Sequence, residues 1–284
     1  AFSMHYVPTF KEPMHYQQAQ GQIAWWLQPE NKQIYVNSGA IHLRSEYEDA
    51  TGYLWLAIPW HNPGADMDLY LHIGAQQLAA AEYKKYVPAV VPPNLTEWLQ
   101  ASIGDNNPGV ANEAGFVFRG TLNTPVNNAR SYQLYLDLEN ASLDYHEDWP
   151  ALTALNGRLL VDDETIDASV FSGKLYESDV SGVHIATRPN PQDEGAILTV
   201  TGDVAGIASD GLRVLREGYM REMIGSNMDS WYFQGTHHTR VDIAVPLLAD
   251  AKGASQQVDV DFNMPLVGME NLSLYLRNVD GQLS

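Results

Sequence analysis

Few side chains in this sequence have the types and spacing that catalysis or metal binding requires. His237 and His238 form the most evident metal-binding pair, but adjacent residues of a strand point to opposite faces. No carboxylate or third histidine stands nearby at a recognisable metal-ligand spacing. We therefore interpret the pair as solvated strand residues and expect no metal site.

Two acidic clusters offer carboxylates for calcium binding or acid–base chemistry. Asp144, Glu147 and Asp148 precede Trp149-Pro150, and the second cluster spans 162–164. Both separate strand-like segments, so we interpret both as turns. A hydrolase that uses Asp144 and Asp148 stays open as a third hypothesis.

Sequence motifs for the common enzyme classes are absent. There is no GxSxG, no HExxH, no P-loop and no GxGxxG before a helix. We therefore expect a protein that is not an enzyme, with no catalytic residues and no cofactor.

Composition excludes several further functions. The 284 residues carry a net charge of −19 and no cysteine, which excludes disulfides, thiol catalysis and cysteine-ligated zinc. A surface this acidic repels phosphate backbones, so we expect no nucleic-acid partner. No apolar run reaches 18 residues, so we expect no direct membrane insertion by this chain.

The elements that must position any site are mostly strands. Apolar and polar residues alternate with a period of two, which is typical of antiparallel sheets with one wet face. We therefore expect a mainly β (α+β) fold with antiparallel curved sheets. The apolar members of the strongest runs are Leu54, Leu56, Ile58, Leu134, Leu136, Leu138, Val241, Ile243, Val245, Val258, Val260 and Phe262.

Two segments break this alternation and predict helical insertions. Residues 75–103 read as helical at both ends with a break near Pro88, and Asn94 or Thr96 is the expected cap of the second part. Residues 209–229 read as one or two helices, which we expect to cover an edge or an end of the sheet. The expected cap is Ser209 or Asp210. The expected apolar stripe consists of Leu212, Leu215, Tyr219 and Met223.

Three similar segments around Gly21, Gly157 and Gly281 indicate an internal repeat. Between them, the order of strands, helix and strands recurs. We predict a first unit at 1–148 and a second at 149–284 that includes the start of a third, forming a continuous structure rather than independent domains. Both chain ends read as interior to the strand pattern, so we expect a segment of a longer protein.

Several tryptophans lie near strand ends or on strand faces. Trp25, Trp26, Trp55 and Trp60 have rings that could stack on sugars. We interpret them instead as core packing and edge protection.

Four runs together resemble a known family of envelope proteins. They are VPPNLTEWLQASIG followed by GFVFRGTL within 91–122, RSYQLYLDLENASLDY at 130–145, WPALTALNGRLLVDD at 149–163, and DGLRVLREGYMREMIGSNMDSWYFQGT at 210–236. In this order they resemble the YhdP family, in the AsmA-like group of Gram-negative envelope proteins. The first 15 residues match least clearly.

The resemblance implies a location and a function. Members of the family resemble an inner-membrane-anchored rod that crosses the periplasm, built from repeated β units that form an elongated open groove lined with apolar side chains. They are linked to phospholipid transport toward the outer membrane. The implied partners are phospholipid acyl chains and the remaining repeats of the same polypeptide, and the twelve alternating apolar residues above become the candidate groove lining.

Alternation alone leaves one structural question open. An open groove and a closed core demand the same pattern of apolar residues. The alternative hypothesis is therefore a closed β-sandwich that binds a glycan or a protein partner.

Overall fold

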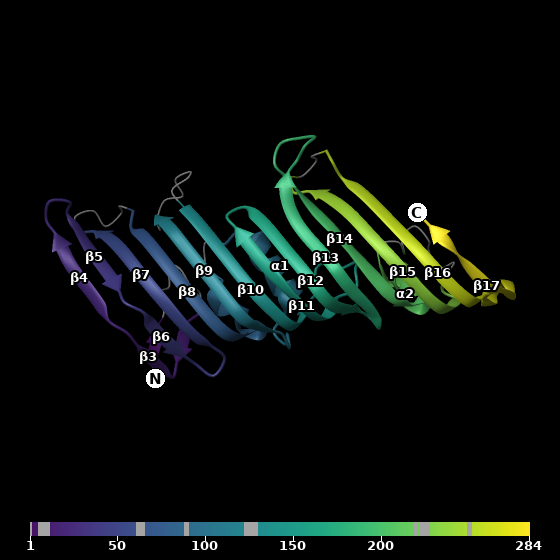
Figure 1. Ribbon diagram of the computed structural model, residues 1–284, viewed down its shortest axis with the longest axis horizontal. Coiled ribbons are helices and arrows are strands. Elements are labelled where there is room, and N and C mark those ends of the chain that lie inside the picture. Colours follow the sequence, from purple (N-terminus) through teal and green to yellow (C-terminus); the bar gives the residue numbers. More distant parts are fainter. Residues whose placement is uncertain are drawn as a thin grey trace. The chain divides into compact units, whose positions relative to one another are not determined.

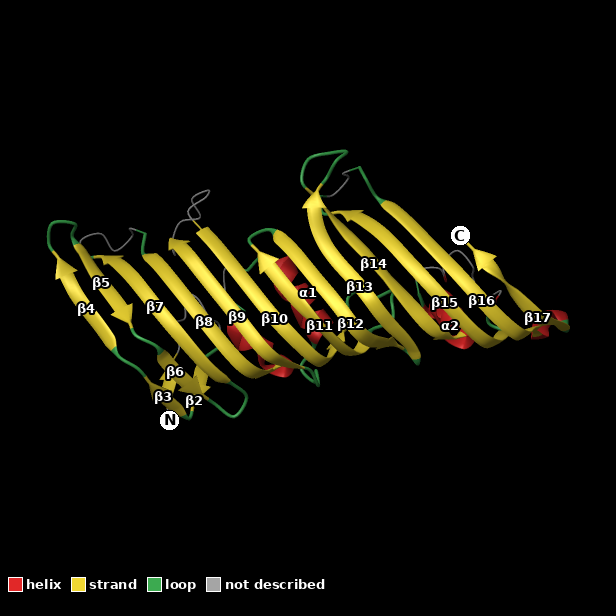
Figure 2. Cartoon of the chain, viewed as in Figure 1, coloured by secondary structure: helices red, strands yellow, loops and turns green. Residues whose placement is uncertain are grey.

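Antiparallel strands form most of this protein, as the alternation predicts. The computed structural model describes residues 2–4, 12–60, 66–87, 91–121, 130–218, 221, 228–248 and 252–284. In the part of the chain it describes, the longer helices are α1 (Pro93–Ile103) and α2 (Ala208–Glu217), both of which lie behind the strands in Figure 2.

The strands become longer after the N-terminal segment. The N-terminal strands are β1 (Phe2–Met4), β2 (Met14–Tyr16), β3 (Gln18–Gln20), β4 (Ile23–Gln28), β5 (Gln33–Ser38), β6 (Ile41–Arg44), β7 (Asp49–Pro59), β8 (Asp68–Ala79), β9 (Val110–Thr121) and β10 (Arg130–Leu143). The C-terminal strands are β11 (Leu152–Asp162), β12 (Thr165–Leu175), β13 (Ser178–Pro189), β14 (Ala196–Ile207), β15 (Trp231–Pro246), β16 (Ser255–Met269) and β17 (Leu274–Leu283). The described residues also include the short 3₁₀ helices η1 (Ala80–Tyr86) and η3 (Glu270–Leu272).

Most strands that follow one another in the sequence also lie side by side in the main sheet. Its hydrogen-bonded order is β17-β16-β15-β14-β13-β12-β11-β10-β9-β8-β7-β5-β4, with β6 beside β7 and β3 beside β6. Figure 1 shows this meander in chain order. The order ends at β4 and at β17, which do not pair with each other, so the sheet is open. The prediction of an open antiparallel sheet is confirmed. The closed sandwich is wrong, because β3 to β17 belong to one sheet and not to two sheets packed face to face.

The chain forms two compact units that we describe separately. Unit 1 comprises residues 1–96, 110–138 and 158–166, and unit 2 comprises residues 97–109, 139–157 and 167–284. Strands β10 and β11 contribute residues to both.

The order of elements recurs along the chain. Strand β3 pairs with β6, strand β4 pairs with β5, and both β5 and β6 pair with β7. The consecutive strands β3 and β4 therefore count as one interrupted strand, and β5 and β6 count as another. Counted this way, four strands, a helical segment and two strands occupy residues 18–143, and the same order recurs at 152–269. This recurrence supports the predicted units at 1–148 and 149–284, whose boundaries stay a prediction.

The predicted helical segment 75–103 is partly wrong. Residues up to Ala79 continue strand β8, because Ala75 pairs with Ala114 of β9 and this pairing satisfies their backbone groups. The helix α1 begins at Pro93, so neither Asn94 nor Thr96 precedes it as a cap. Proline suits this first position because its missing N–H would have no helical acceptor. Pro88 lies outside the described residues.

The predicted helix 209–229 is confirmed at its start. Helix α2 begins at Ala208 after Ile207, without a side-chain cap, so Ser209 and Asp210 do not cap it. Of the expected apolar stripe, Leu212 is buried and Leu215 is half-buried. Tyr219 and Met223 lie outside the described residues.

Gly157 marks a close approach between two strands of unit 2. A Cβ atom at this position would lie 2.4 Å from the backbone oxygen of Ser169 on β12. Backbone cannot rotate away as a flexible side chain can, so only glycine fits here without shifting a strand. Gly281 lies near the ring of Phe262, where a Cβ atom would be 3.1 Å from the ring.

Gly157→Ala is therefore expected to lower the free energy of unfolding by about 1–3 kcal/mol, the usual cost of overpacking. The matched control is Gly74→Ala in β8, where a Cβ atom would have no neighbour within 4 Å. Because alanine restricts the unfolded chain more than glycine, Gly74→Ala should be neutral or slightly stabilising. Urea unfolding of both variants measures the difference, and equal midpoints would show that the close approach is absent.

Candidate functional site

Cross-strand register gathers the predicted apolar residues of unit 2 on one sheet face. Val241 on β15 lies opposite Gly202 on β14 and Val258 on β16. Directly opposed residues of antiparallel strands project from the same face. We name this surface the apolar face of unit 2. Its members are Leu198, Val200, Val204, Val241, Ile243, Val245, Val258, Val260, Phe262 and Leu283.

Unit 1 has an equivalent surface of its own. Leu54 on β7 lies opposite Leu71 on β8, and Leu56 lies between Val36 on β5 and Leu69 on β8. We name this surface the apolar face of unit 1. Its members are Ile23, Trp25, Leu27, Ile34, Val36, Leu54, Leu56, Ile58, Leu69, Leu71 and Phe118.

The predicted lining residues of β10 are also half-buried. Leu134, Leu136 and Leu138 alternate with polar residues whose side chains bond across to β11. Gln133 donates a hydrogen bond to Asp162 at 3.0 Å, and Arg158 donates one to Asp137 at 3.4 Å. The polar side chains therefore share one side of the strand pair, and the leucines occupy the alternate positions.

Both apolar faces are exposed to solvent along part of their length. On the edge strand β4, Trp25 is 67% exposed and Ile23 is 62% exposed. In unit 2, Leu283 is 63% exposed and Val245 is 44% exposed. Exposed apolar side chains that adjoin one another mark interaction surfaces. Trp25 is therefore not part of a packed core, whereas its position on the edge strand β4 fits the expected edge protection.

Sequence reasoning missed part of these faces. On β14, Leu198, Val200 and Val204 belong to the apolar face of unit 2 and were not among the predicted lining residues. The alternation is present in ILTVTGDVAGI, but two glycines interrupt it. On β4, apolar residues occupy both faces, so the pattern does not indicate which face is functional.

Helix α2 covers one end of the apolar face of unit 2. Its own residue Leu212 is buried, and its Gly211 lies near His237, whose side chain shares this face with Phe262. The buried carboxylate of Asp210 accepts hydrogen bonds from Ser178 Oγ at 2.7 Å and from the backbone N–H of Glu177 at 3.1 Å. These bonds fix the start of the helix to strand β13.

Two arginines fix the rest of α2. The guanidinium of Arg213 stacks on the ring of Tyr176 at 3.8 Å from its centroid. Arg216 donates hydrogen bonds to the carbonyl oxygens of Met228 and Asp229, at 2.6 and 3.0 Å for its terminal nitrogen. The helix is thus held at both ends over part of the apolar face, while the strand segment beyond Thr239 stays uncovered.

A buried carboxyl group lies at the corresponding end of unit 1. Glu48 is buried, and desolvation raises its pKa, although the charge of Lys85 in η1 and a hydrogen bond with Tyr16 oppose the shift. Ala50 and Ala75, which share the apolar face of unit 1, are buried at this end. Each unit therefore has one covered end and one exposed stretch of apolar face.

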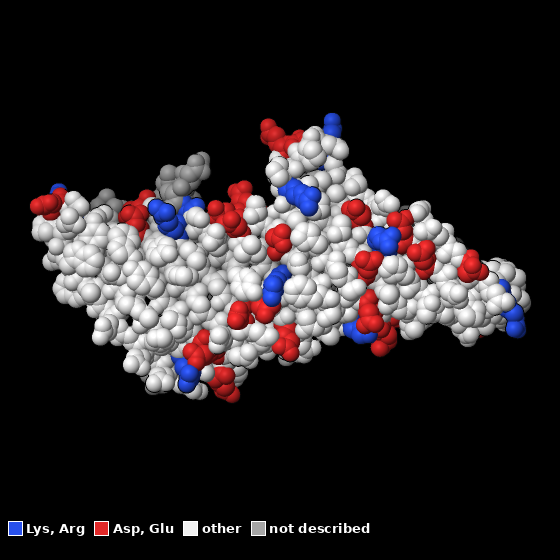
Figure 3. Space-filling view, viewed as in Figure 1, with Lys and Arg blue, Asp and Glu red and all other residues white. Residues whose placement is uncertain are grey.

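The opposite face of unit 2 is charged. Asp203 Oδ1 lies 2.9 Å from His238 Nε2 and 3.7 Å from Arg240 Nε. Arg240 lies opposite Asp259 on β16, whose pKa is lowered by hydrogen bonds from Ser284 and Gln257. Charged side chains of both signs are visible over these strands in Figure 3.

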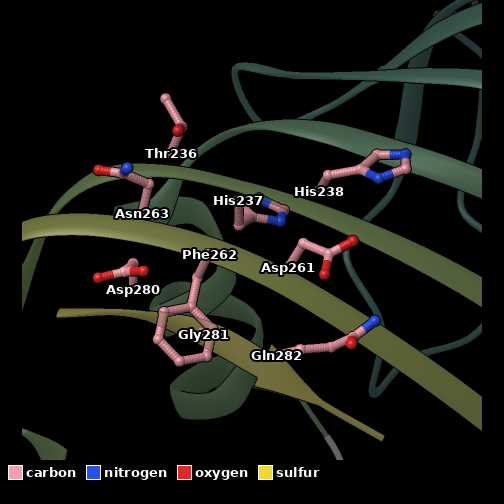
Figure 4. Close-up of a pocket in the computed structure, with 9 residues that line it drawn as sticks. All are labelled: Thr236, His237, His238, Asp261, Phe262, Asn263, Asp280, Gly281 and Gln282. Atoms are coloured by element: carbon pink, nitrogen blue, oxygen red, sulfur yellow. The ribbon is translucent and has the colours of Figure 1, made fainter.

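The two histidines that resemble a metal site point away from each other. His237 lies next to α2, and its Nδ1 atom is hydrogen-bonded to Thr239 Oγ1 at 3.0 Å. His238 projects toward Asp203 on the charged face. Burial lowers the pKa of His237, which disfavours the charged form of its ring. Figure 4 shows both residues and Phe262 among those that line a hollow at strands β15, β16 and β17. The described residues contain no group of three or more potential metal ligands.

Both acidic clusters form turns, as the sequence predicts. Asp163 and Glu164 connect β11 with β12. The N–H of Asp163 donates to the carbonyl oxygen of Tyr132 at 2.9 Å, and the Asp163 carboxylate accepts from the N–H of Tyr132 at 2.8 Å. Asp148 lies between β10 and β11, where its N–H donates to His146 Nδ1 at 3.1 Å. The Asp163 carboxylate and the Asp148 backbone therefore stabilise these turns.

Comparison with known proteins gives a consistent result. The family model described as "YhdP protein" matches residues 1–284. The chain is 22% identical over 293 residues to the intermembrane phospholipid transporter YhdP of Escherichia coli (strain K12), which covers 99% of this chain and 21% of that protein. The chain therefore spans about a fifth of the length of this curated relative. No solved structure matches the chain.

One further property bears on membranes. Within the described ranges, no helix is both long and apolar enough to cross a lipid bilayer.

Asp210→Ala is expected to loosen α2 and expose the apolar surface beneath it. The substitution leaves the hydroxyl of Ser178 and the N–H of Glu177 without their acceptor, at a cost of about 1–3 kcal/mol. Fluorescence of the dye ANS should rise above the wild-type level. The control Ser209→Ala changes an exposed residue of the same helix and should leave the signal unchanged. Equal dye binding by both variants would contradict the covering role of α2.

Proposed function

This chain belongs to the YhdP family, and we propose that it is a non-catalytic, periplasmic segment of a bridge-like protein that shelters phospholipid acyl chains between the inner and outer membranes. The two apolar faces are the proposed lipid-binding surfaces. The support comes from the family, from the relative that is named a phospholipid transporter, and from the exposure of these faces.

The single observation that carries the proposal is an uncharged sheet face left open to solvent. The members of both apolar faces are aliphatic or aromatic, and Trp25 and Leu283 are mostly exposed. Leaving such side chains in water is unfavourable by roughly 25 cal/mol for each Å² of apolar surface. A ligand with long methylene chains removes this cost and needs no hydrogen bonds in return.

The transfer free energy of a lipid explains why the apolar residues must be contiguous. Moving about 15 methylene groups from an apolar phase into water costs roughly 12 kcal/mol, at about 0.8 kcal/mol for each group. A path with polar gaps would impose part of this cost at each gap. The paired strands present Leu, Val and Ile side chains in successive rows within each unit, and in unit 2 the uncharged Thr239 and Gln256 are polar residues among them.

Charge on the opposite surface complements this function. Asp203, His238 and Arg240 keep one face of unit 2 hydrated, and the net charge of −19 keeps the chain soluble. An acidic surface also disfavours side-on binding to an anionic bilayer. We therefore propose that lipid headgroups stay at the water-exposed margin while the acyl chains lie on the sheet.

The remaining length of the polypeptide is the second proposed partner. Strands β4 and β17 stand at the two ends of the sheet order, and an open sheet edge readily pairs with another strand. We propose that further repeats of the same polypeptide extend the sheet, as the 21% coverage of the relative allows.

Site-specific photo-crosslinking tests the lipid proposal directly. A benzophenone amino acid replaces Leu54 or Val260 on the apolar faces of the full-length protein, expressed in a Gram-negative host with ³²P-labelled lipids. Irradiation should attach radioactive phospholipid at both positions, because the reactive group then contacts acyl chains.

Neighbouring residues on the same strands supply matched controls. Tyr53 and Asp261 project from the opposite faces, so the same amino acid placed there should capture little or no lipid. Equal capture on both faces, or no capture at Leu54 and Val260, would refute the proposed lipid-binding surfaces.

A further inference from the structure

The reverse side of unit 1 carries a row of aromatic side chains. Trp26 lies opposite Tyr35, and Trp55 lies opposite Tyr70, so the rings come from the four strands β4, β5, β7 and β8. Tyr53 projects from the same side as Trp55. We name these five residues the aromatic face of unit 1. They lie on the side opposite to Leu54 and Trp25.

The rings form a nearly continuous platform. The centroids of Trp26 and Tyr35 are 5.4 Å apart with an interplanar angle of 19°, and those of Tyr35 and Trp55 are 5.7 Å apart. Tyr53 and Tyr70 meet edge to face at 6.1 Å. Trp26 is 43% exposed and Tyr53 is 37% exposed, so the interpretation of Trp26 as core packing is wrong.

The surroundings of the platform are polar but mostly uncharged. Gln28 and Gln33 pair beside Trp26 and Tyr35, and the Tyr35 hydroxyl bonds the Gln33 side chain. Charged residues occur at its margin, where Asp68 lies opposite Ala57 and Arg119 lies opposite Tyr70. In Figure 3, the surface over β4, β5 and β7 is largely without charged side chains.

A hollow of about 540 Å³ adjoins one end of this platform. Its lining includes Ala24, Asn37, Gly39 and Tyr53. Asn37 lies opposite Trp55, and its Oδ1 atom is buried without a hydrogen-bond partner among the described residues. A buried acceptor without a donor is costly, whereas a ligand that donates a hydrogen bond there removes the cost.

Cross-strand aromatic pairs stabilise sheets, but sheet stability does not account for all of these features. Stabilising pairs do not need exposed rings at Trp26 and Tyr53 or an acceptor at Asn37 that lacks a donor. The combination of flat, partly exposed rings, neutral amides and a buried acceptor without a donor instead matches a ligand with apolar ring faces and hydroxyl donors.

We propose that the aromatic face of unit 1 binds a neutral oligosaccharide chain. Sugar rings stack their C–H faces on Trp26, Tyr35 and Trp55, and a hydroxyl at the chain end donates to Asn37 Oδ1. The net charge of −19 repels polyanionic glycans, which selects for uncharged ones. This glycan site lies on the side of the sheet opposite to the proposed lipid surface.

Isothermal titration calorimetry of the 284-residue chain with three neutral hexasaccharides tests the proposal. The probes are cellohexaose, maltohexaose and chitohexaose. At least one should bind the wild type, and Trp26→Ala should weaken that binding about tenfold or more, because a stacking partner is lost. Tyr53→Ala and Asn37→Ala should each weaken binding several-fold.

Trp25→Ala is the matched control, since Trp25 neighbours Trp26 on β4 but projects from the apolar face of unit 1. It should leave saccharide affinity unchanged, and circular dichroism should show that all variants stay folded. The proposal fails if none of the three hexasaccharides binds the wild type at millimolar concentration, or if Trp25→Ala and Trp26→Ala lose affinity equally. It also fails if the polyanion heparin binds more tightly than every neutral probe.

Discussion

Backbone hydrogen bonding is the constraint on which this structure depends. An apolar surface can stay open to solvent only if the backbone polar groups beneath it are already paired. The antiparallel meander meets this condition, because each strand between β4 and β17 has a hydrogen-bonded neighbour on both sides. Leu54, Val241 and their neighbours can therefore remain uncovered without leaving donors or acceptors unpaired. A closed sandwich would satisfy the same backbone groups but would leave no surface for a long ligand.

Polar anchors hold the elements that interrupt the open face. In unit 2, Asp210 fixes α2 to strand β13, and Arg216 fixes its far end to the carbonyl groups before β15. In unit 1, the buried Glu48 occupies the covered end near η1. A buried carboxyl group is costly unless it is hydrogen-bonded, and Asp210 meets this condition through Ser178 and Glu177. Where such anchors are lacking, the faces stay exposed.

Residue alternation predicted the strands, their antiparallel pairing and the faces of Leu54, Val241 and Val260 correctly. It could not distinguish an open face from a closed core, because Leu136 would be apolar in either. The helix predicted from local propensity at 75–79 is wrong, because the pairing of Ala75 with Ala114 favours a strand over the helix that the composition indicates. It also failed at Asp210, which has the residue type of a helix cap but bonds a neighbouring strand instead. Trp25 and Trp26 read alike in sequence, and only the register of β4 shows that they serve opposite faces.

The most direct test of the central claim is paramagnetic broadening of methyl NMR signals by a phospholipid that carries a nitroxide on its acyl chain. If acyl chains lie on the apolar faces, the methyl signals of Leu54, Leu56, Val241 and Val260 broaden strongly. The methyl signals of Ala57 and Ala244, which project from the opposite faces, then stay sharp. Equal broadening of both sets, or broadening confined to Ala57 and Ala244, would contradict a lipid-sheltering role for these faces.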